Sequence, residues 1–215
     1  MEDRALPRRE REKRTQRQEM LAAALDLFSK RGYPNVSMQE IAEKAEFAVG
    51  TLYKFFRSKE DLYKALIHEQ FHMFRESLAK AIEEPDDEID KLRNYVKTKG
   101  ELFHANAPMI RLYFAETQGA RVNVLAGFDS EIRERHDAFQ QTLASVFESG
   151  MKRKRFRKIA DPYSLAVALD SITNGFLFLW MEKPERHPYP EDPDAILNIL
   201  FKGLVVQPEP FGGSE

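Results

Sequence analysis

Apolar residues recur along the chain with helical spacing, and the first clear series lies between residues 21 and 28. Its members fall at positions i, i+3, i+4 and i+7, on one face of an α-helix: Leu21, Ala24, Leu25 and Phe28. Gly32 follows, and glycine just after such a series is a typical signal for the end of a helix. The pattern therefore predicts an amphipathic helix that stops at Gly32.

Two short helices are predicted next. The stretch SMQE, from Ser37 to Glu40, has the form of a capping box, in which the serine hydroxyl accepts a backbone N–H bond and the glutamate reaches back. The apolar face of the helix that follows it consists of Met38, Ile41, Ala42 and Ala45. After a break at Glu46–Ala48, the apolar side of a further short helix consists of Val49, Leu52, Tyr53 and Phe56. A second capping sequence, SKED, opens a long helix from Ser58 to about Ile82.

Helical spacing resumes after the acidic turn EEPDDE. The apolar positions of the next predicted helix are Ile89, Leu92, Val96 and Phe103. Another helix is expected to start near Pro108, after Asn106. A long one from Arg121 to about Ser149 has these inward-facing residues: Ile132, Phe139, Leu143 and Val146.

The last two helices are marked by aspartate–proline pairs. Asp161 and Asp192 each precede a proline, and proline is favoured at the first position of a helix. A proline-rich loop from Lys183 to Pro193 separates the two helices, and Gly203 is expected to close the second. The chain is therefore predicted to be all-α.

The composition excludes several kinds of site. The chain of 215 residues contains no cysteine, which excludes disulfides, thiolate metal sites and cysteine nucleophiles. Its first residues are too highly charged for a secretory signal, so we expect a cytoplasmic protein. The segment Pro162–Met181 is apolar enough for a membrane span, but Asp170 would cost about 2.5–3.5 kcal/mol at the centre of a bilayer. We interpret it as a buried helix of a soluble assembly, with no membrane partner.

Charge is distributed unevenly, although the net charge is only -2. Between residues 4 and 17 the acidic residues are Glu10 and Glu12. They are outnumbered by these basic residues: Arg4, Arg8, Arg9, Arg11, Lys13, Arg14 and Arg17. A basic arm suits a polyanion such as DNA, because each neutralised phosphate releases condensed counterions. A solvated tail is the alternative for the arm alone. The run KRKRFRK, residues 152–158, is interpreted as a solvated loop in preference to a second nucleic-acid patch.

Two short helices joined by a tight turn and preceded by a longer helix form a helix-turn-helix arrangement. The likeness becomes specific in the stretches AALDLFSKRGY, VSMQEIAEKA and VGTLYKFFRSKEDLYKAL. From about Arg14 to Phe74 the sequence resembles the DNA-binding domain of the TetR family of transcriptional regulators. The resemblance implies a three-helix DNA-binding domain (14–74, helix-turn-helix at about 37–56) and a helical effector-binding and dimerisation domain (75–205). The charge distribution adds a basic arm (1–13), and the tail (206–215) is expected to be disordered.

Two positions depart from the pattern of that family. Glu46 stands in the turn where the family usually has glycine, which adopts positive φ without strain. Ala48 stands at the N-cap of the recognition helix in place of serine or threonine, and its side chain cannot accept an N–H bond. Each departure is expected to cost on the order of 1 kcal/mol of local stability, which the fold can tolerate.

The helix after the turn is the expected recognition helix. With its apolar stripe facing the core, the outward-facing residues are Gly50, Thr51, Lys54 and Phe55. Gly50 lets the backbone approach the duplex, Thr51 and Lys54 can read base edges, and Lys54 can instead bind a phosphate. Phe55 can contact thymine methyl groups. The resemblance adds three residues that would contact the DNA backbone: Ser37, Tyr53 and Lys59. The alternatives are that Tyr53 packs in the core and that Lys59 is simply solvated.

The stretch HEQFH matches the H-E-x-x-H pattern of zinc proteases, in which two histidines four apart bind the metal. A hydrolase that uses His68, Glu69 and His72 is therefore an alternative function. A zinc site also needs a third ligand, and Arg75 and Leu78 occupy the positions where the extended motif has glycine and histidine. We predict a structural helix here, and no metal, no cofactor and no enzymatic activity.

The C-terminal half resembles the TetR-family regulatory domain more weakly. In that family the last two helices pair with their copies in a partner subunit, which implies a homodimer that binds a palindromic DNA operator. Small residues in segment 162–181 suit such close approach: Ala166, Ala168, Ser171 and Gly175. The resemblance implies a repressor that a small molecule releases from DNA, with a TetR-like activator as the alternative.

An effector site in the helical half is expected to be a mostly apolar pocket with a few polar anchors. The candidates by helix placement are Phe103, His104, Arg111, Tyr113, Phe114, Asn174, Phe178 and Trp180, and core packing is the alternative for the phenylalanines. His104, Arg111 and Asn174 stand out, because a polar group on an apolar face must find a partner. We expect a lipophilic or aromatic effector with an anionic group that Arg111 can bind.

Overall fold

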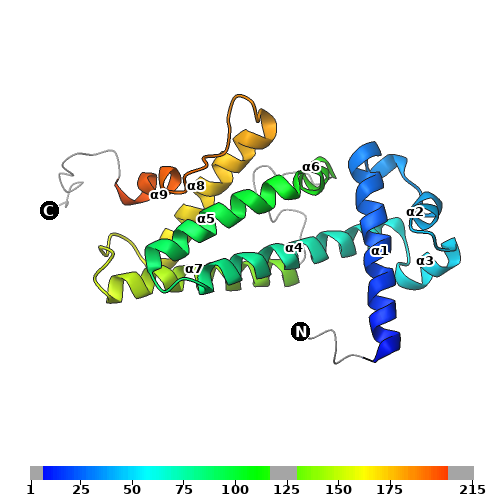
Figure 1. The fold of residues 1–215 in the computed structure, drawn as a ribbon, viewed down its shortest axis with the longest axis horizontal. Helices are drawn as coiled ribbons and strands as arrows, with labels where there is room; N and C mark the ends of the chain where they lie inside the picture. Colours follow the sequence, from blue (N-terminus) through cyan, green and yellow to red (C-terminus); the bar gives the residue numbers. More distant parts are fainter. Residues whose placement is uncertain (1–6, 117–129, 203–215) are drawn as a thin grey trace. The chain divides into compact units, whose positions relative to one another are not determined.

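The computed structural model describes residues 7–116 and 130–202, and all regular elements within these ranges are helical (Figure 1). The all-α prediction is confirmed for this part of the chain. The helices are α1 (Arg8–Arg31), α2 (Met38–Lys44), α3 (Val49–Phe55), α4 (Lys59–Glu83), α5 (Glu88–Ala105), α6 (Ala107–Glu116), α7 (Ser130–Lys152), α8 (Pro162–Glu182) and α9 (Asp194–Phe201). A short 3₁₀ turn, η2 (Tyr33–Asn35), connects α1 and α2.

The described residues form two compact units. The first unit contains residues 7–73, 106–116 and 130–132, and the second contains residues 74–105 and 133–202. Helix α4 contributes its beginning to the first unit and its end to the second. Helix α6 packs on α1 and so belongs to the first unit, although the sequence division placed it with the effector-binding half.

The core of the first unit lies where α1, α2, α3 and the start of α4 meet (Figure 1). Its most deeply buried side chains are Met20, Ala24, Phe28, Ile41, Leu52, Leu62 and Leu66. The rings of Phe28, Tyr33 and Tyr63 pack against one another, with centroids 5.1 to 6.3 Å apart. The predicted apolar face of α1 therefore packs into a real core.

The core of the second unit is formed by the end of α4 together with α5, α7, α8 and α9. Arg93 of α5 donates two hydrogen bonds to Asp194 at the start of α9, at 2.8 and 2.9 Å. The Tyr189 hydroxyl donates to the Val96 carbonyl at 2.9 Å. The Tyr189 ring packs directly against Gly100, where a side chain would not fit. These contacts fasten α9 and the proline-rich loop to α5.

Several helix starts match their predictions. The Ser37 capping box is present: its Oγ accepts from Glu40 N at 3.2 Å, and its own N–H donates to the Glu40 carboxylate at 2.8 Å. Ser58 Oγ accepts from Asp61 N at 3.1 Å at the start of α4. Asp161 caps α8 through Ser164 N at 2.9 Å.

Other boundaries differ from the predictions. Helix α1 already begins at Arg8, so the described part of the basic arm is helical. Helix α9 begins one residue later than predicted, after Pro193, and Asp192 accepts a bond from Asp194 N at 2.9 Å. The predictions on these residues lie outside the described part of the structure: Arg4, the segment from Arg121, the side chain of Ile132, Gly203 and the tail 206–215.

Candidate nucleic-acid interface and effector site

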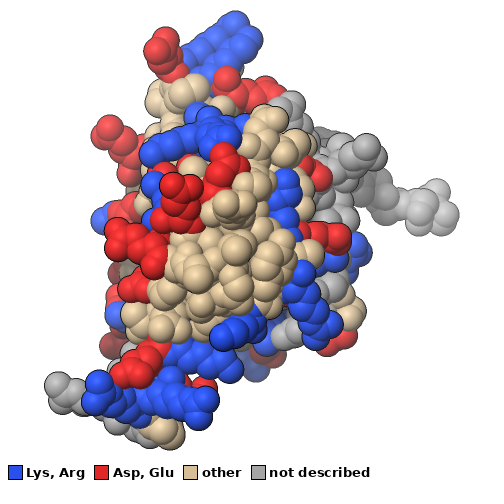
Figure 2. All heavy atoms as spheres, turned by 90° about the vertical axis from the view of Figure 1, so that its right-hand side faces the viewer, with Lys and Arg blue, Asp and Glu red and all other residues tan. Residues whose placement is uncertain are grey.

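Helix α3 presents an exposed surface made of small and polar residues. Gly50, Tyr53 and Lys54 are exposed, and Thr51 is half-buried. A Cβ atom added at Gly50 would meet nothing within 4 Å, so the packing of the unit itself does not require glycine there. Figure 2, viewed from the side where Figure 1 draws α2 and α3, shows uncharged residues in the middle of this side, with Asp and Glu mainly to their left and Lys and Arg above, to the right and below.

The predicted orientation of α3 is wrong at its ends. Tyr53 is 51% exposed and Val49 39% exposed, whereas both were assigned to the core. Phe55 was expected to face outward, but it is half-buried and packs against the core of the first unit. The helix stops at Phe55, and Phe56 has extended backbone angles, so a helical wheel that includes Phe56 has the wrong phase.

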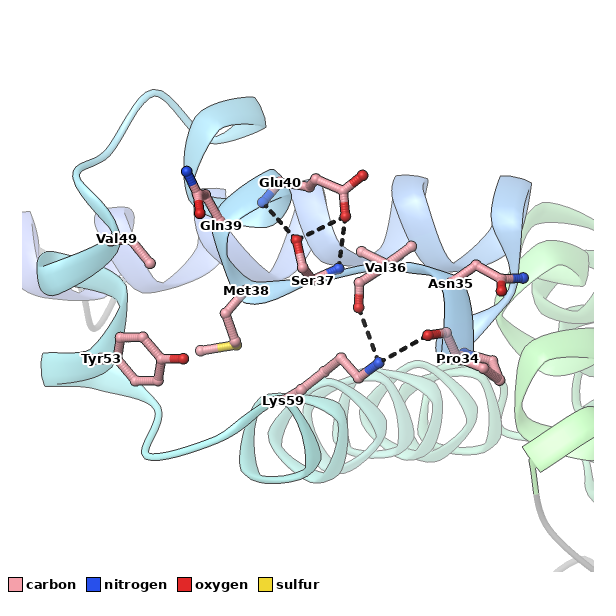
Figure 3. A pocket seen from close by; sticks show the side chains of 10 residues that line it. All are labelled: Pro34, Asn35, Val36, Ser37, Met38, Gln39, Glu40, Val49, Tyr53 and Lys59. Atoms are coloured by element: carbon pink, nitrogen blue, oxygen red, sulfur yellow. Dashed lines mark hydrogen bonds between the residues drawn. The ribbon is translucent and has the colours of Figure 1, made fainter.

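An open groove of about 760 Å³ lies between the start of α2, α3 and the start of α4 (Figure 3). The lining residues are Pro34, Asn35, Val36, Ser37, Met38, Gln39, Glu40, Val49, Tyr53 and Lys59. Figure 3 shows the Tyr53 side chain facing Met38 across the groove. Three of the predicted DNA-backbone contacts, Ser37, Tyr53 and Lys59, therefore line one concave surface.

Lys59 is held by the turn that precedes α2. Its Nζ donates to the carbonyl of Tyr33 at 2.9 Å. It also donates to the carbonyls of Val36 at 2.9 Å and Pro34 at 3.4 Å (Figure 3). The ammonium also lies 4.4 Å from the centroid of the Tyr33 ring, a cation–π distance. Lys59 thus joins α4 to the loop before α2, and its contact with a phosphate stays a prediction.

Ser37 and Glu40 are likewise engaged with each other. The Ser37 hydroxyl donates to the Glu40 carboxylate at 2.7 Å. Hydrogen bonds from the Ser37 backbone and hydroxyl, together with Arg31, lower the pKa of Glu40 to about 2. The Glu40 carboxylate is therefore charged at neutral pH, and Arg31 pairs with it at 2.7 Å.

The turn between α2 and α3 has the geometry that its sequence disfavours. Glu46 has φ 60°, in the left-handed region where glycine is favoured. Ala48 is the N-cap residue of α3, and no side chain there accepts a hydrogen bond. Both departures from the family pattern therefore lie where the backbone needs the usual residue.

The HEQFH stretch lies on α4, and its glutamate has a structural partner. The Glu69 carboxylate forms an ion pair with Arg17 of α1. The Arg17 guanidinium also lies 5.4 Å from the centroid of the Phe56 ring. Across residues 7–116 and 130–202, no group of three or more His, Asp or Glu side chains is placed to hold a metal ion.

The predicted effector residues are divided between the two units. Arg111, Tyr113 and Phe114 belong to the first unit, and the other five belong to the second: Phe103, His104, Asn174, Phe178 and Trp180. Arg111 was predicted to be a polar group on an apolar face that must find a partner, but it is exposed on α6, so that argument does not apply to it. Tyr113 is buried, with its ring centroid 6.3 Å from that of Phe71 and 5.7 Å from that of Phe114.

Two candidates in the second unit share an aromatic contact. The His104 ring is exposed but stacks on Trp180, with centroids 3.9 Å apart, and its Nδ1 lies 2.8 Å from the Gly100 carbonyl. Phe103 is buried, with its ring centroid 5.7 Å from that of Phe74, and Phe178 is half-buried. These contacts fit core packing and leave the assignments as predictions.

A buried polar network, absent from the sequence-based predictions, links α5 and α8. Lys99 forms an ion pair with Asp170, and both side chains are about nine-tenths buried. The Tyr95 hydroxyl donates to Asp170, and Asn174 Nδ2 donates to the other carboxylate oxygen at 3.1 Å. Although burial by itself raises the pKa of Asp170, Lys99 and Tyr95 outweigh it and hold the pKa below its usual value.

One signal in the sequence could have revealed this network. Lys99 follows Leu92, Tyr95 and Val96 on the same helix face, so a charged residue interrupts an apolar series. His136 and Gln140 stand four apart in the same way on α7, ahead of Leu143 and Phe147. Charged or amide side chains inside an apolar series predict buried polar contacts.

Helix α8 is long and apolar enough to cross a membrane by length and composition, with 28% of its apolar window buried. Asp170 on this helix binds two side chains of α5, so one face packs inside the second unit. The opposite face is a stripe of exposed residues at four-residue spacing: Tyr163, Val167, Ser171, Gly175 and Leu179. Ala166, predicted to contact a partner, is instead fully buried in the unit's own core.

Comparisons with known proteins identify relatives that match up to 90% of the chain. The family model described as "Bacterial regulatory proteins, tetR family" matches residues 20–66. The fatty acid metabolism regulator protein of Bacillus subtilis is 30% identical over 194 residues, which cover 90% of this chain and 98% of that protein. The transcriptional activator FasR of Mycolicibacterium smegmatis is 28% identical over 77% of this chain and 72% of its own length.

Two further comparisons concern a repressor and a solved structure. The transcriptional repressor KstR2 of Rhodococcus jostii is 28% identical over 67% of this chain and 70% of its own length. The crystal structure of the regulator FadR from Bacillus subtilis in complex with stearoyl-CoA has a TM-score of 0.67 at 18% identity. That alignment covers 87% of this chain and 99% of the other, and it shows a shared fold.

Proposed function

We propose that this chain, which belongs to the tetR family of bacterial regulatory proteins, is a homodimeric repressor that a fatty-acyl effector releases from a palindromic operator. It is a DNA-binding transcriptional regulator with an N-terminal helix-turn-helix domain and a helical C-terminal domain. The observation that carries the proposal is the 30% identity to a fatty acid metabolism regulator over nearly the whole length of that protein.

DNA recognition is assigned to the exposed surface of α3. Gly50, Thr51 and Lys54 are accessible there, and the open space around Gly50 supports a close approach of the helix backbone to the duplex. Ser37, Tyr53 and Lys59 line the neighbouring groove and are assigned to the DNA backbone. Phe55 supports α3 from the core side, and the exposed basic residues of α1 add attraction for phosphates.

The homodimer is assigned to α8 and α9. The exposed stripe on α8 has apolar residues at its ends and Ser171 and Gly175 in its middle, where small side chains allow two helices to approach closely. Ile199 of α9 is 50% exposed and adds apolar surface. A contact with the same helices of a second copy would bury this surface, and a two-fold dimer presents two recognition helices to a palindromic site.

The effector is assigned to the second unit and to the fatty-acyl class. The relatives whose names state a role in fatty acid metabolism, and the fold shared with a protein solved with stearoyl-CoA, support this class. Helix α4 belongs to both units, so a ligand that shifts its end can act on its beginning, which Lys59 joins to the loop before α2. The ligand must bind the DNA-incompetent state about 10⁴-fold more tightly to swing the populations from 1:99 to 99:1.

An activator of the same fold is the second candidate, because the relative FasR is named a transcriptional activator. Measuring transcription from the chain's own upstream DNA, with and without the protein, separates the two. We also propose that the protein is cytoplasmic and has no enzymatic activity. Stoichiometric zinc in purified protein, lost in the double variant His68→Ala/His72→Ala, would contradict this reading of the HEQFH stretch.

Binding of the purified protein to its own upstream DNA tests the proposal. We expect a single site of two-fold symmetry with half-sites about one helical turn apart, occupied by a dimer. Removing residues 1–11 should flatten the salt dependence of the affinity and leave the sequence preference intact. An asymmetric site bound by a monomer would contradict the proposal.

A further inference from the structure

The second unit contains a buried amide group with an unused hydrogen-bonding atom. Gln140 of α7 is only 4% exposed, and its Nε2 lies 3.3 Å from His136 Nε2, one turn earlier. Its Oε1 is buried and has no hydrogen-bond partner among the described residues. An unpaired buried acceptor costs about 1–3 kcal/mol, so a group placed here for stability alone is unexpected.

The guanidinium group of Arg75 has an unused donor and interacts electrostatically with the same histidine, His136. Arg75 of α4 has its Nε buried with no hydrogen-bond partner in the described part of the chain. Its charge acts on the ring of His136 and is itself opposed by the charge of Arg135. Burial lowers the pKa of Arg75, and the charge of Arg135 lowers it further. Both effects disfavour the charged guanidinium, and an anion beside it would counteract them.

The neighbouring charges do not compensate Arg75. Asp170 is the buried carboxylate of the network, but it is already paired with Lys99. Burial lowers the pKa of His136, which favours the neutral ring. Among nearby charges Asp170 and Asp137 oppose this effect, and Lys99 and Arg75 add to it. The side chain of Arg75 is partly buried, and no carboxylate of the described residues pairs with its charge. A matching anion beside it would form charge-assisted hydrogen bonds.

We propose that Arg75, His136 and Gln140 bind the anionic group of the effector, so that the effector is an amphiphile recognised by its charged end as well as by its hydrocarbon chain. The inference rests on the proposed control by a fatty-acyl effector and names the residues that receive its polar end. It replaces the exposed Arg111 as the anion-binding residue.

The chemistry fits an oxygen anion. Arginine donates two parallel hydrogen bonds to a carboxylate or a phosphate. Neutral His136 can add one N–H donor, and Gln140 Nε2 can add the hydrogen that it does not direct at His136. The unused Gln140 Oε1 is an acceptor and does not bind the anion. A free fatty acid supplies a carboxylate and an acyl-CoA supplies phosphates, and both present the same acceptor oxygens. Since Arg75 lies on α4, an anion bound there pulls on the helix that both units share.

Binding of three ligands of equal chain length to the full-length protein tests the inference. The probes are palmitate, palmitoyl-CoA and uncharged hexadecanol, and their affinities follow from the emission of Trp180, the only tryptophan. The wild-type protein should bind at least one of the two anions tenfold or more tightly than the alcohol. Loss of the preference for palmitate in the variants points to a carboxylate, and loss for palmitoyl-CoA alone points to a phosphate.

Three variants and one control are compared. Arg75→Met should bring the anion and the alcohol to similar affinities, Gln140→Leu should reduce the preference severalfold, and hexadecanol should bind all proteins alike. Arg75→Lys keeps the charge without the paired donors and should retain part of the preference, which preserves the test if Arg75→Met folds poorly. The matched control is Lys80→Met, which removes one exposed positive charge from the same helix and should change nothing.

The outcomes separate the inference from the proposed function. If an anion releases the operator but Arg75→Met and Arg75→Lys keep the full preference, the residue assignment is overturned while effector control stands. Equal binding of hexadecanol and both anions by the wild type would also overturn it. If the wild-type protein binds none of the three probes, the fatty-acyl proposal fails and the inference fails with it.

Discussion

The two units of the molecule satisfy their polar groups in different ways. In the first unit most polar contacts are local and near the surface, as in the capping box of Ser37 and Glu40, three residues apart. In the second unit a charged network is buried between helices, with Lys99 and Asp170 far apart in the sequence. Local contacts fix the exposed DNA-binding surface, whereas the buried network fixes how α5 packs on α8.

The largest expected effect tests the buried network. Asp170→Ala leaves Lys99 charged and unpaired, and it should lower the free energy of unfolding by about 3–5 kcal/mol. Chemical denaturation measures the change. The matched control Lys97→Met, on the exposed side of α5, should stay within about 0.5 kcal/mol of the wild type. A loss below about 1 kcal/mol for Asp170→Ala would show that the network is not a structural element.

The same carboxylate predicts a pH dependence. Because its folded-state pKa lies below the unfolded value of about 3.9, its contribution to stability is present above that value and is lost as the pH falls through the folded pKa. The free energy of unfolding should therefore decrease more steeply below about pH 4 in the wild type than in Asp170→Ala. Parallel acid titrations of the two proteins would contradict the assignment.

The next effect concerns the DNA-binding surface of the first unit. Lys54→Ala should weaken operator binding by about 1–3 kcal/mol per half-site if the side chain reads a base, with no loss of stability, since it is exposed. Fluorescence anisotropy with labelled operator measures it. Lys64→Ala, which removes an exposed lysine of α4, serves as the control. If Lys54→Ala, Thr51→Ala and Tyr53→Phe all bind like the wild type, α3 is not the recognition helix.

A smaller change in stability is expected at two strained backbone positions, one in each unit. Glu46 and Lys154 both have positive φ, at 60° and 58°. Glycine relieves the strain of that region, so Glu46→Gly and Lys154→Gly should each stabilise the protein by about 1 kcal/mol. Thermal unfolding measures both variants. Destabilisation by Glu46→Gly alone would indicate a specific role for the glutamate side chain.

The smallest effect concerns the start of α3. Ala48→Ser introduces an acceptor for an unpaired N–H at the N-cap and should add about 1 kcal/mol to the stability. Thermal unfolding measures the change against the wild-type alanine, with Ala48→Val as a control that provides no side-chain acceptor. Equal stability of the serine variant and the wild type would show that the first turn of α3 gains nothing from a side-chain cap.

The sequence could predict contacts between residues close together in the chain, but not contacts between distant ones. The caps at Ser37, Ser58 and Asp161 depend on residues three or four apart, and all three are present. The orientation of α3 was mistaken because Phe56 leaves the helical phase, which a periodic pattern does not reveal. The partners of Asp170 and Asp194 lie on α5, and no local rule pairs residues across such distances in the chain.

The central claim is that ligand binding in the second unit controls DNA binding by the first. The most direct measurement is the affinity of the full-length protein for its operator as palmitoyl-CoA or palmitate is added. The account predicts that DNA is released over the same concentration range in which Trp180 emission changes. Saturation of the Trp180 signal by both ligands with an unchanged operator affinity would contradict it.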